Sequence, residues 1–397
     1  MNPELLALKP YPFERLNQLK ASCKAPVKLA PILLSIGEPK HPVPTLVTQA
    51  LSNHLDELGQ YPATRGSEPL REAIAQWLTR RFDLTTLNAE QHLLPVNGTR
   101  EALFSFVQAT IDRSKPAKVL MPNPFYQIYE GAALLSGAEP CYINVTEASQ
   151  FEPDFDAVDE ADWRACQLLF ICTPGNPSGA VLSLERLQWL IKQAETYDFI
   201  IASDECYSEI YPDENNPPPG LLQAAQLMGN DQYKRCVVFH SLSKRSNAPG
   251  LRSGFVAGDA TIIKQYLLYR TYHGCAMSLP VQHASIAAWS DELHVKESRQ
   301  LYRNKFAQIV PLLSPWLSVE QPAGGFYLWA GTPGSDTDFA QKLYQQQNIT
   351  VLPGSYLSRD TTAGNPGNGR VRIALVAPEA ACIEAAERIV QFMQRIR

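Results

Sequence analysis

A polar segment that closely follows an apolar stretch constrains this chain more than any other part of its sequence. Cys236–Phe239 is typical of a buried strand. Soon after it come two serines, a lysine and an arginine: Ser241, Ser243, Lys244 and Arg252. Hydroxyls and a guanidinium can hold a phosphate dianion, and a lysine amine can form an imine with a carbonyl group. A solvated basic turn would have the same composition, so this segment alone leaves both interpretations open.

A second apolar run also ends in side chains that can take part in chemistry. Phe199–Ser203 is typical of a short buried strand, and Asp204 and Tyr207 lie at its end. A carboxylate can pair with a pyridine nitrogen and keep it protonated, while a phenol can donate a hydrogen bond to an oxygen on the same ring. An acidic residue after a strand is also a common helix N-cap. Together with Lys244, these residues point to pyridoxal 5′-phosphate (PLP) as a cofactor.

A third apolar run, Leu168–Cys172, leads into a loop with two prolines and two glycines, Thr173–Gly179. Proline and glycine fix the backbone of such a loop, and Asn176 projects from it. A plain turn would explain the prolines and glycines. It would not explain why polar residues suited to one ring recur at the ends of three strand candidates. Because ligands gather at the carboxyl ends of parallel strands, these residues are expected to meet.

The motifs Asn-Pro-x-Gly at 176–179, Asp-x-x-Tyr at 204–207 and Ser-x-Ser-Lys at 241–244 resemble the fold-type I PLP-dependent aminotransferases, over essentially the whole chain. Further segments resemble one branch of that superfamily, the bacterial N-succinyldiaminopimelate aminotransferases: residues 10–16, 35–41, 123–131 and 271–277. The resemblance implies an enzyme that interconverts N-succinyl-LL-2,6-diaminopimelate plus 2-oxoglutarate and N-succinyl-2-amino-6-oxopimelate plus glutamate, in lysine biosynthesis.

Other activities on the same fold stay open, because fold alone does not select among them. These are an aminotransferase for aromatic, aliphatic or acetylornithine-type substrates and a PLP-dependent C–S lyase. A non-enzymatic PLP-binding regulator is disfavoured. Such proteins carry a helix-turn-helix domain before the aminotransferase-like part, and the resemblance here starts near Pro10.

The resemblance also implies roles for individual residues. Lys244 is expected to bind PLP covalently and to move the substrate Cα proton, Asp204 to pair with the pyridine nitrogen, and Tyr207 to donate to the ring oxygen. The remaining cofactor contacts are expected from Tyr61, Thr99, Arg100, Tyr126, Asn176, Ser241, Ser243 and Arg252. Gly37, Asn176 and Arg372 are expected to bind the substrate, and the planar guanidinium of Arg372 can grip an α-carboxylate through two parallel hydrogen bonds.

Without the resemblance, several of these residues have plainer interpretations. Arg372 would be a surface arginine of a strand, and Tyr126 would be a core tyrosine. Asn97–Glu101 would be an ordinary capped helix start, although free amides there also suit a phosphate. Many members of the superfamily have a smaller or neutral residue at the position of Arg100, which leaves the contact of its side chain open.

A homodimer with shared active sites is a further implication of the resemblance. Tyr61 is expected to contact the phosphate bound by the neighbouring subunit, and Tyr272–Gly274 to reach toward the neighbouring cofactor. The same loop, together with Lys40 and Arg100, supplies the candidates for binding the distal end of the substrate.

Strand candidates at 118–121, 168–172, 199–203, 237–239 and 254–257 alternate with amphipathic helices. This alternation predicts an α/β fold with a mostly parallel sheet, and the resemblance implies seven strands in it. A large PLP-binding domain is expected at 46–290 and a small α+β domain at 291–397, which the N-terminal segment 1–45 joins. In the small domain, Gly324–Trp329 precedes an alternating strand at 370–375 and a final helix with an apolar stripe.

Composition narrows the class of protein further. The 397 residues carry a net charge of −5 without a basic stripe, so nucleic acid is not an expected partner. No apolar run approaches the about 20 residues that cross a bilayer, and no secretory signal is apparent. The 8 cysteines lack a Cys-x-x-Cys pair and the 7 histidines lack a ligand spacing. We therefore expect reduced thiols, a cytoplasmic location and no metal, with amino acids and 2-oxo acids as the small-molecule partners.

Overall fold

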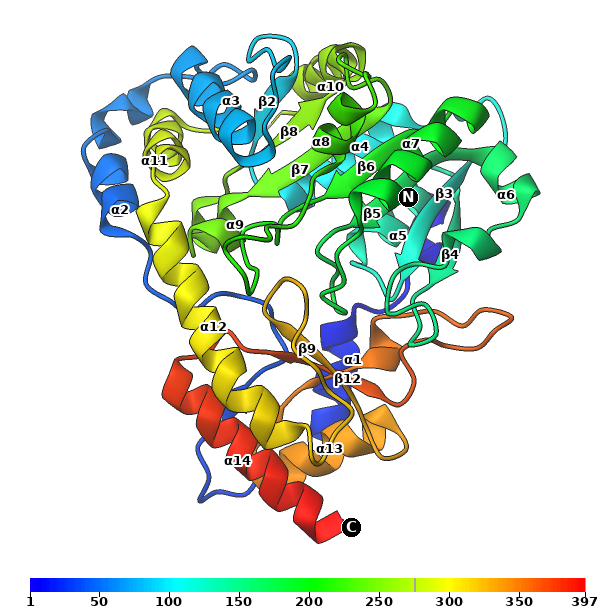
Figure 1. Ribbon diagram of the computed structural model, residues 1–397, viewed down its shortest axis with the longest axis vertical. Helices are drawn as coiled ribbons and strands as arrows, with labels where there is room; N and C mark the ends of the chain where they lie inside the picture. The colour runs from blue at the N-terminus through cyan, green and yellow to red at the C-terminus, as the bar shows by residue number, and fades with distance from the viewer. Residues whose placement is uncertain (275, 397) are drawn as a thin grey trace.

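A seven-stranded sheet forms the centre of the larger part of the molecule (Figure 1). The computed structural model describes residues 1–274 and 276–396. In spatial order the strands are β2 (Leu93–Val96), β8 (Gly254–Gly258), β7 (Cys236–Ser241), β6 (Ile200–Asp204), β5 (Cys166–Cys172), β3 (Lys118–Asn123) and β4 (Glu139–Asn144). Only β8 runs against its neighbours, since it pairs antiparallel with both β2 and β7. The other pairs are parallel.

Helices cover both faces of this sheet, and the strand sequences show why. Along β5, Leu168 and Phe170 pack into one apolar cluster while Leu169 and Ile171 pack into the other. This is the period of two that a strand imposes on its side chains. One cluster is closed by α4 (Thr99–Thr110), α5 (Ile128–Leu135) and α10 (Ala260–His273). The other is closed by α2 (Thr45–Ser52), α3 (Glu68–Phe82), α6 (Glu160–Ala165), α7 (Leu184–Tyr197), α8 (Leu221–Leu227) and α11 (Leu279–Ser290).

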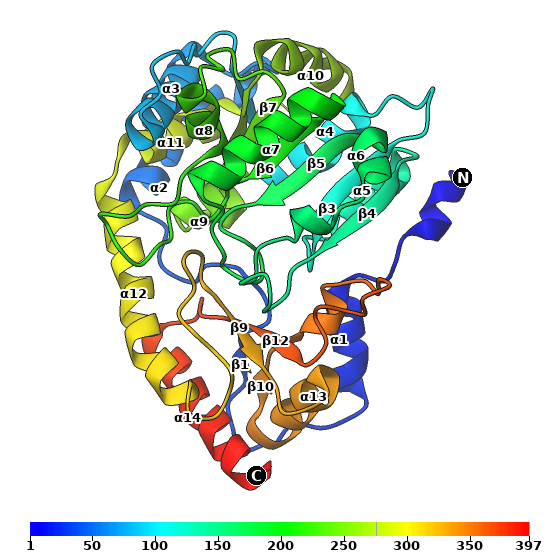
Figure 2. The same cartoon turned by 45° about the vertical axis from the view of Figure 1, so that its right-hand side comes forward.

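A smaller α+β unit lies below the large sheet in Figures 1 and 2. Its sheets are β11 (Leu352–Pro353), β12 (Arg370–Ala374) and β9 (Tyr327–Gly331), and β1 (Ile32–Leu33) with β10 (Ile349–Thr350). Its helices are α1 (Pro12–Ala21), α12 (Leu293–Leu313), α13 (Asp336–Gln347) and α14 (Glu379–Ile396). Ile32 and Leu34 pack in one apolar cluster with residues from α12 to α14. The N-terminal segment therefore shares a core with the C-terminal part of the chain.

The predicted fold class is confirmed, and the five strand candidates coincide with β3, β5, β6, β7 and β8. Two strands of the large sheet, β2 and β4, were missing from these candidates. Pro95 weakens the strand signal of β2, and β4 is an edge strand with the mixed sequence Glu-Pro-Cys-Tyr-Ile-Asn. The division of the chain at residues 45 and 290 stays a prediction.

A strap from the small unit, residues 357–361, is tied to the large sheet. Asn123 and Arg359 exchange two hydrogen bonds of 2.9 Å through the Asn123 side chain and the Arg359 backbone. The Arg359 guanidinium also donates to both carboxylate oxygens of Glu130, at 2.7 and 2.6 Å. Leu357 O accepts from the Phe125 amide at 3.1 Å. These bonds set the distance between the two units beside the cavity described below.

Replacing Glu130 by alanine should destabilise the fold by about 3 kcal/mol, because it leaves the Arg359 guanidinium buried without its charge partner. The side chains of this pair are only 5% and 15% exposed. Glu160→Ala is the matched control, since Glu160 and Arg164 form a pair that is 63% and 68% exposed. Its loss should cost less than about 0.5 kcal/mol. Equal denaturant midpoints for the two variants would show that the strap does not depend on this ion pair.

Candidate active site

Five strands of the large sheet direct their polar termini to one edge. The carboxyl ends of β2, β5, β6 and β7 lie there, and so does the amino end of β8, because β8 runs in the opposite direction. A cavity of about 540 Å³ opens at this edge. Residues predicted for the site line it as follows: Gly37, Thr99, Arg100, Tyr126, Asn176, Asp204, Tyr207, Ser241, Ser243, Lys244, Arg252 and Arg372.

Lys244 lies in the short helix α9 (Leu242–Arg245), just beyond β7. Its amine donates a hydrogen bond to the carbonyl of Gly37, which belongs to the N-terminal segment. Burial lowers the pKa of Lys244 to about 8, with Arg372 adding to the effect. A much larger fraction of this amine is therefore neutral near pH 7 than for an ordinary lysine, and only a neutral amine is a nucleophile or a base.

Asp204, at the end of β6, is buried and makes no ion pair with any described residue. Burial raises the pKa of its carboxyl group, while hydrogen bonds from Cys206 and Tyr129 act in the opposite direction. The Tyr129 hydroxyl donates to Asp204 Oδ2 at 2.7 Å, and the Cys206 amide donates to Oδ1 at 3.3 Å. Tyr129 received no role from the sequence. Its place at the start of α5, three residues after Tyr126, was the only signal that could have suggested one.

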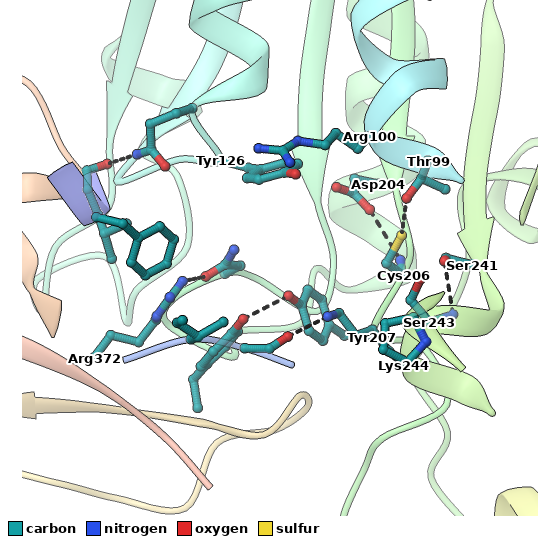
Figure 3. A pocket seen from close by; sticks show the side chains of 18 of the residues that line it. Thr99, Arg100, Tyr126, Asp204, Cys206, Tyr207, Ser241, Ser243, Lys244 and Arg372 are labelled. Carbon is teal, nitrogen blue, oxygen red and sulfur yellow. Dashed lines mark hydrogen bonds between the residues drawn. The ribbon is translucent and has the colours of Figure 1, made fainter. Parts of the chain in front are cut away.

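One wall of the cavity offers donors suited to a phosphate. Thr99 begins α4, Ser241 ends β7 and Ser243 lies in α9 (Figure 3). Arg252 adopts the left-handed backbone conformation, with φ of 54°, and its guanidinium contacts the Glu101 carboxylate at 2.9 Å. A Cβ atom on Gly98 would lie 2.2 Å from Arg252 Nη2. Glycine is therefore required before α4 for the guanidinium and the helix start to approach each other.

The opposite wall comes from the small unit. Arg372, on β12, is buried and donates to Asn176 Oδ1 at 3.0 Å and to the Ser35 carbonyl at 2.7 Å. Its Nε has no hydrogen-bond partner among the described residues. Tyr327, on β9, lies under the guanidinium, and its hydroxyl is 3.0 Å from that of Tyr207. Arg372 is therefore not the surface residue that its sequence alone suggested.

Arg100 and Tyr126 lie side by side at the mouth of the cavity (Figure 3). The Arg100 guanidinium donates to the Tyr11 hydroxyl at 3.1 Å and forms no ion pair with a described residue. Tyr126 and Tyr11 raise its pKa further above the usual arginine range. This cation is permanently charged, with two phenols beside it and the Glu101 carboxylate near enough to add to the same effect.

Three predicted residues lie outside the cavity of their own chain. The Tyr61 side chain is fully exposed, at 104%, and Tyr272 is 87% exposed. Lys40 forms an ion pair with Glu38 and does not line the cavity. The segment 271–277 includes Cys275, which lies outside the described residues, so the structure leaves that part of the loop untested.

Comparison with known proteins assigns the chain to a family. The profile of the family "Aminotransferase class I and II" matches residues 30–389. The chain belongs to the class I and II aminotransferases. An LL-diaminopimelate aminotransferase of Nitratidesulfovibrio vulgaris is 30% identical to this aminotransferase over 391 residues, 97% of each chain.

Solved structures agree with this assignment. An aminotransferase from Neisseria meningitidis is 52% identical, with a TM-score of 0.95 over 99% of this chain and 100% of that one. A probable N-succinyldiaminopimelate aminotransferase from Thermus thermophilus is 25% identical, with a TM-score of 0.85 over 96% of this chain and 99% of that one. The predictions of an aminotransferase and of PLP as its cofactor are confirmed.

The residues of the cavity suit PLP in their chemistry. A lysine amine of lowered pKa, a buried carboxylate and a set of hydroxyl, guanidinium and helix-start donors lie together at one sheet edge. These are the partners that an aldehyde, a pyridine nitrogen and a phosphate require. The contact of each residue with the cofactor stays a prediction.

Three expectations concern what this aminotransferase lacks. No described helix has both the length and the apolar composition to cross a membrane. The cysteines at 23, 141, 166, 172, 206, 236 and 382 are free thiols. One described group has ligand atoms close enough to share a metal: His54, Glu57 and His283. The two imidazole rings are stacked at 3.6 Å and 6°, which sets their lone pairs parallel rather than convergent. The absence of a metal stays a prediction.

The lowered pKa of Lys244 has a measurable consequence. Covalent capture of PLP by cofactor-free protein, trapped with borohydride, should accelerate as the pH rises toward about 8 and level off above it. The sign follows because the amine loses its proton through this range and only the neutral form reacts. Lys244→Ala should show no specific capture. A rate that still increases steeply from pH 9 to pH 10 would show that the amine has an ordinary pKa.

Proposed function

We propose that this aminotransferase exchanges the amino group between glutamate and N-succinyl-2-amino-6-oxopimelate, a step of lysine biosynthesis. The products are 2-oxoglutarate and N-succinyl-LL-2,6-diaminopimelate. The observation that carries the proposal is a pair of guanidiniums, Arg372 and Arg100, that line the cavity without an acidic partner among the described residues.

The two guanidiniums can bind two of the three carboxylates of the succinylated compound, and LL-diaminopimelate also offers two, so the distal nitrogen has to distinguish the candidates. Arg372, deep in the cavity, is placed to bind the α-carboxylate beside the reacting carbon, with Asn176 and Gly37 next to it. Arg100, at the mouth, is placed to bind a carboxylate at the far end of a longer substrate. The cavity is also lined by apolar and amide side chains that suit an acylated chain: Phe13, Gln127 and Leu357.

The acids of the cavity favour the succinylated compound over free diaminopimelate. Glu101 is paired with Arg252, and Asp204 accepts hydrogen bonds at the floor. The distal nitrogen of the succinylated substrate is an uncharged amide. In LL-diaminopimelate it is an ammonium, and the excess of basic over acidic residues in the cavity lining disfavours a further cation there.

The names of related proteins support each of the two compounds as a candidate substrate. The relative from Nitratidesulfovibrio vulgaris is an LL-diaminopimelate aminotransferase, and the structure from Thermus thermophilus is a probable N-succinyldiaminopimelate aminotransferase. LL-diaminopimelate is therefore the second candidate substrate. Both compounds share the α-amino acid end, so the choice depends on the residues near the mouth of the cavity.

In this proposal, the large domain holds the cofactor. Asp204 would pair with the pyridine nitrogen, Tyr207 would donate to the ring oxygen and Tyr126 would contact the ring. Thr99, Ser241, Ser243, Arg252 and the backbone amides at the start of α4 would hold the phosphate. PLP, when bound, supplies an electron sink for the electron pair left on the substrate Cα.

Lys244 and Arg372 do the remaining work on the substrate. Arg372 grips the α-carboxylate through a planar fork, which fixes the direction of the Cα–H bond. The Lys244 amine takes the proton from Cα, and a pKa of about 8 suits an amine that must both accept and return a proton near neutral pH. Tyr129 keeps the Asp204 carboxylate charged by donating to it, since a hydrogen bond to the charged form opposes the effect of burial.

A direct assay separates the two candidate substrates. Purified protein should transfer an amino group from N-succinyl-LL-2,6-diaminopimelate to 2-oxoglutarate with a kcat/KM at least about tenfold above that for LL-diaminopimelate, because the distal ammonium of the latter would lie near the Arg100 cation. Acetylornithine and tyrosine complete the panel of donors. A kcat/KM for LL-diaminopimelate equal to or above that for the succinylated compound would overturn the proposal.

Arg100→Gln should lower kcat/KM for the succinylated substrate by about 10- to 100-fold, the range for losing one charged hydrogen-bond partner. Its effect on glutamate should be smaller, because the shorter chain of glutamate does not extend to the mouth of the cavity. Lys40→Gln is the control, since Lys40 is paired with Glu38. Arg372→Lys should impair both substrates alike. If Arg100→Gln lowered kcat/KM equally for the two substrates, Arg100 would not be the residue that binds the distal end of the substrate.

We further propose that the protein forms a homodimer in which Tyr61 contacts the phosphate bound in the neighbouring subunit's site. We also propose that it works in the cytoplasm. Tyr61 is fully exposed beside η2 (Leu55–Gly59), where Leu55 and Leu58 are exposed as well. An aromatic and two leucines exposed together suit burial against a second copy of the chain.

Mixing Lys244→Ala with Tyr61→Ala tests this arrangement. If Tyr61 acts across the interface, a mixed dimer has one site with both lesions and one with neither. Random subunit exchange should then restore about a quarter of wild-type activity in a two-fold dimer. No recovery, with exchange confirmed by labelled subunits, would show that Tyr61 does not act in the neighbouring site.

A further inference from the structure

Tyr327, in the Gly324–Trp329 segment, lines the cavity and contacts residues of both walls. It begins β9 in the small unit and is only 3% exposed. Its hydroxyl lies 3.0 Å from the hydroxyl of Tyr207, which follows β6 of the large sheet. The ring lies under the Arg372 guanidinium, with 4.5 Å between Arg372 Cζ and the ring centroid.

The N-terminal segment packs closely against the Tyr327 hydroxyl. A Cβ atom on Gly37 would lie 1.8 Å from the Tyr327 oxygen. A side chain at position 37 would therefore occupy the place of this hydroxyl. Gly37 also accepts the hydrogen bond from the Lys244 amine, so Tyr327 lies among three residues of the proposed mechanism.

We propose that Tyr327 is a positioning residue of the active site. Its hydroxyl orients and polarises the Tyr207 hydroxyl, and its ring supports Arg372. This inference rests on the proposed roles of Tyr207 and Arg372. A single side chain of the small unit then fixes the orientation of both the Tyr207 phenol, which faces the cofactor, and the Arg372 guanidinium, which faces the substrate.

The direction of the hydrogen bonds follows from the number of protons. A tyrosine hydroxyl has one proton to donate and can accept from others. Burial and Tyr327 raise the pKa of Tyr207 well above its usual range, so Tyr207 stays a neutral phenol. If the Tyr207 hydroxyl donates its hydrogen bond to the cofactor oxygen, then Tyr327 is the donor in the hydrogen bond between the two phenols. Accepting this bond makes Tyr207 a stronger donor, because hydrogen bonds in a chain polarise one another.

A nearby tyrosine provides a matched control. Tyr302, on α12, is buried and contacts Phe326, the neighbour of Tyr327, with 5.4 Å between ring centroids. Its hydroxyl has no hydrogen-bond partner among the described residues. Removing that hydroxyl changes the packing as little as removing the one from Tyr327, but breaks no bond to Tyr207.

The test is a pH titration of the visible absorbance of PLP-loaded protein without substrate, in Tyr327→Phe, Tyr207→Phe and Tyr302→Phe. A hydrogen-bond donor to the cofactor's ring oxygen favours the deprotonated form of the cofactor. Weakening this donor therefore raises the apparent pKa of the bound cofactor. We expect an increase of about 0.5 pH unit for Tyr327→Phe, a larger increase for Tyr207→Phe and none for Tyr302→Phe. Tyr327→Leu, which also removes the ring under Arg372, should in addition raise KM for glutamate about tenfold.

Two results would overturn the inference, and they have different meanings. A wild-type titration in Tyr327→Phe together with a shifted titration in Tyr207→Phe would show that Tyr327 does not act on Tyr207. A wild-type titration in both variants would remove Tyr207 from the cofactor, and the inference about Tyr327 would fail with it. Neither result depends on which diaminopimelate compound is the substrate, because the titration contains no substrate.

Discussion

A carboxylate buried without an ion pair is the constraint on which this site depends. Asp204 lies at the end of a central strand, where burial favours its neutral form. Hydrogen bonds from Tyr129 and Cys206 are what oppose that preference. Tyr129 is fully buried and stacks on Phe170 of the neighbouring strand at 4.3 Å. The packing of the sheet core thus positions the hydroxyl that supports the charge on Asp204, and no described cation forms an ion pair with this carboxylate.

The substrate side of the cavity depends on the contact between the two units. Arg372, Tyr327 and Gly37 all come from the small unit, whereas Asp204 ends a strand of the large sheet and Tyr207 and Lys244 closely follow such strands. The strap at 357–361 and the hydrogen bond between Lys244 and Gly37 cross this boundary on two sides. A change in the spacing of the units would therefore alter how the substrate lies relative to the cofactor, and it would also disturb the bonds that Tyr207 and Lys244 make to Tyr327 and Gly37.

The strands and site residues that depend on local patterns and motifs could be predicted from the sequence. Asn176, Asp204 and Lys244 follow strands with clear apolar runs, so both the sheet and the convergence of these residues could be anticipated. Tyr129 and Tyr327 were not assigned roles, because each acts through a hydrogen bond to a residue 75 or 120 positions away, and no local pattern shows such a bond. The reversed direction of β8 was equally invisible, since a strand has the same alternation in either direction.

The cavity has four basic lining residues, Arg100, Lys244, Arg252 and Arg372, and two acidic ones, Glu101 and Asp204. On a chain whose net charge is −5, this excess makes the mouth a local region of positive potential. Field lines concentrate in such a recess and draw anions toward it, while cationic amines are repelled. The same charges that hold a dicarboxylate once bound therefore also select which molecules arrive, and mobile ions in the solvent would weaken that selection over about 8 Å at physiological ionic strength.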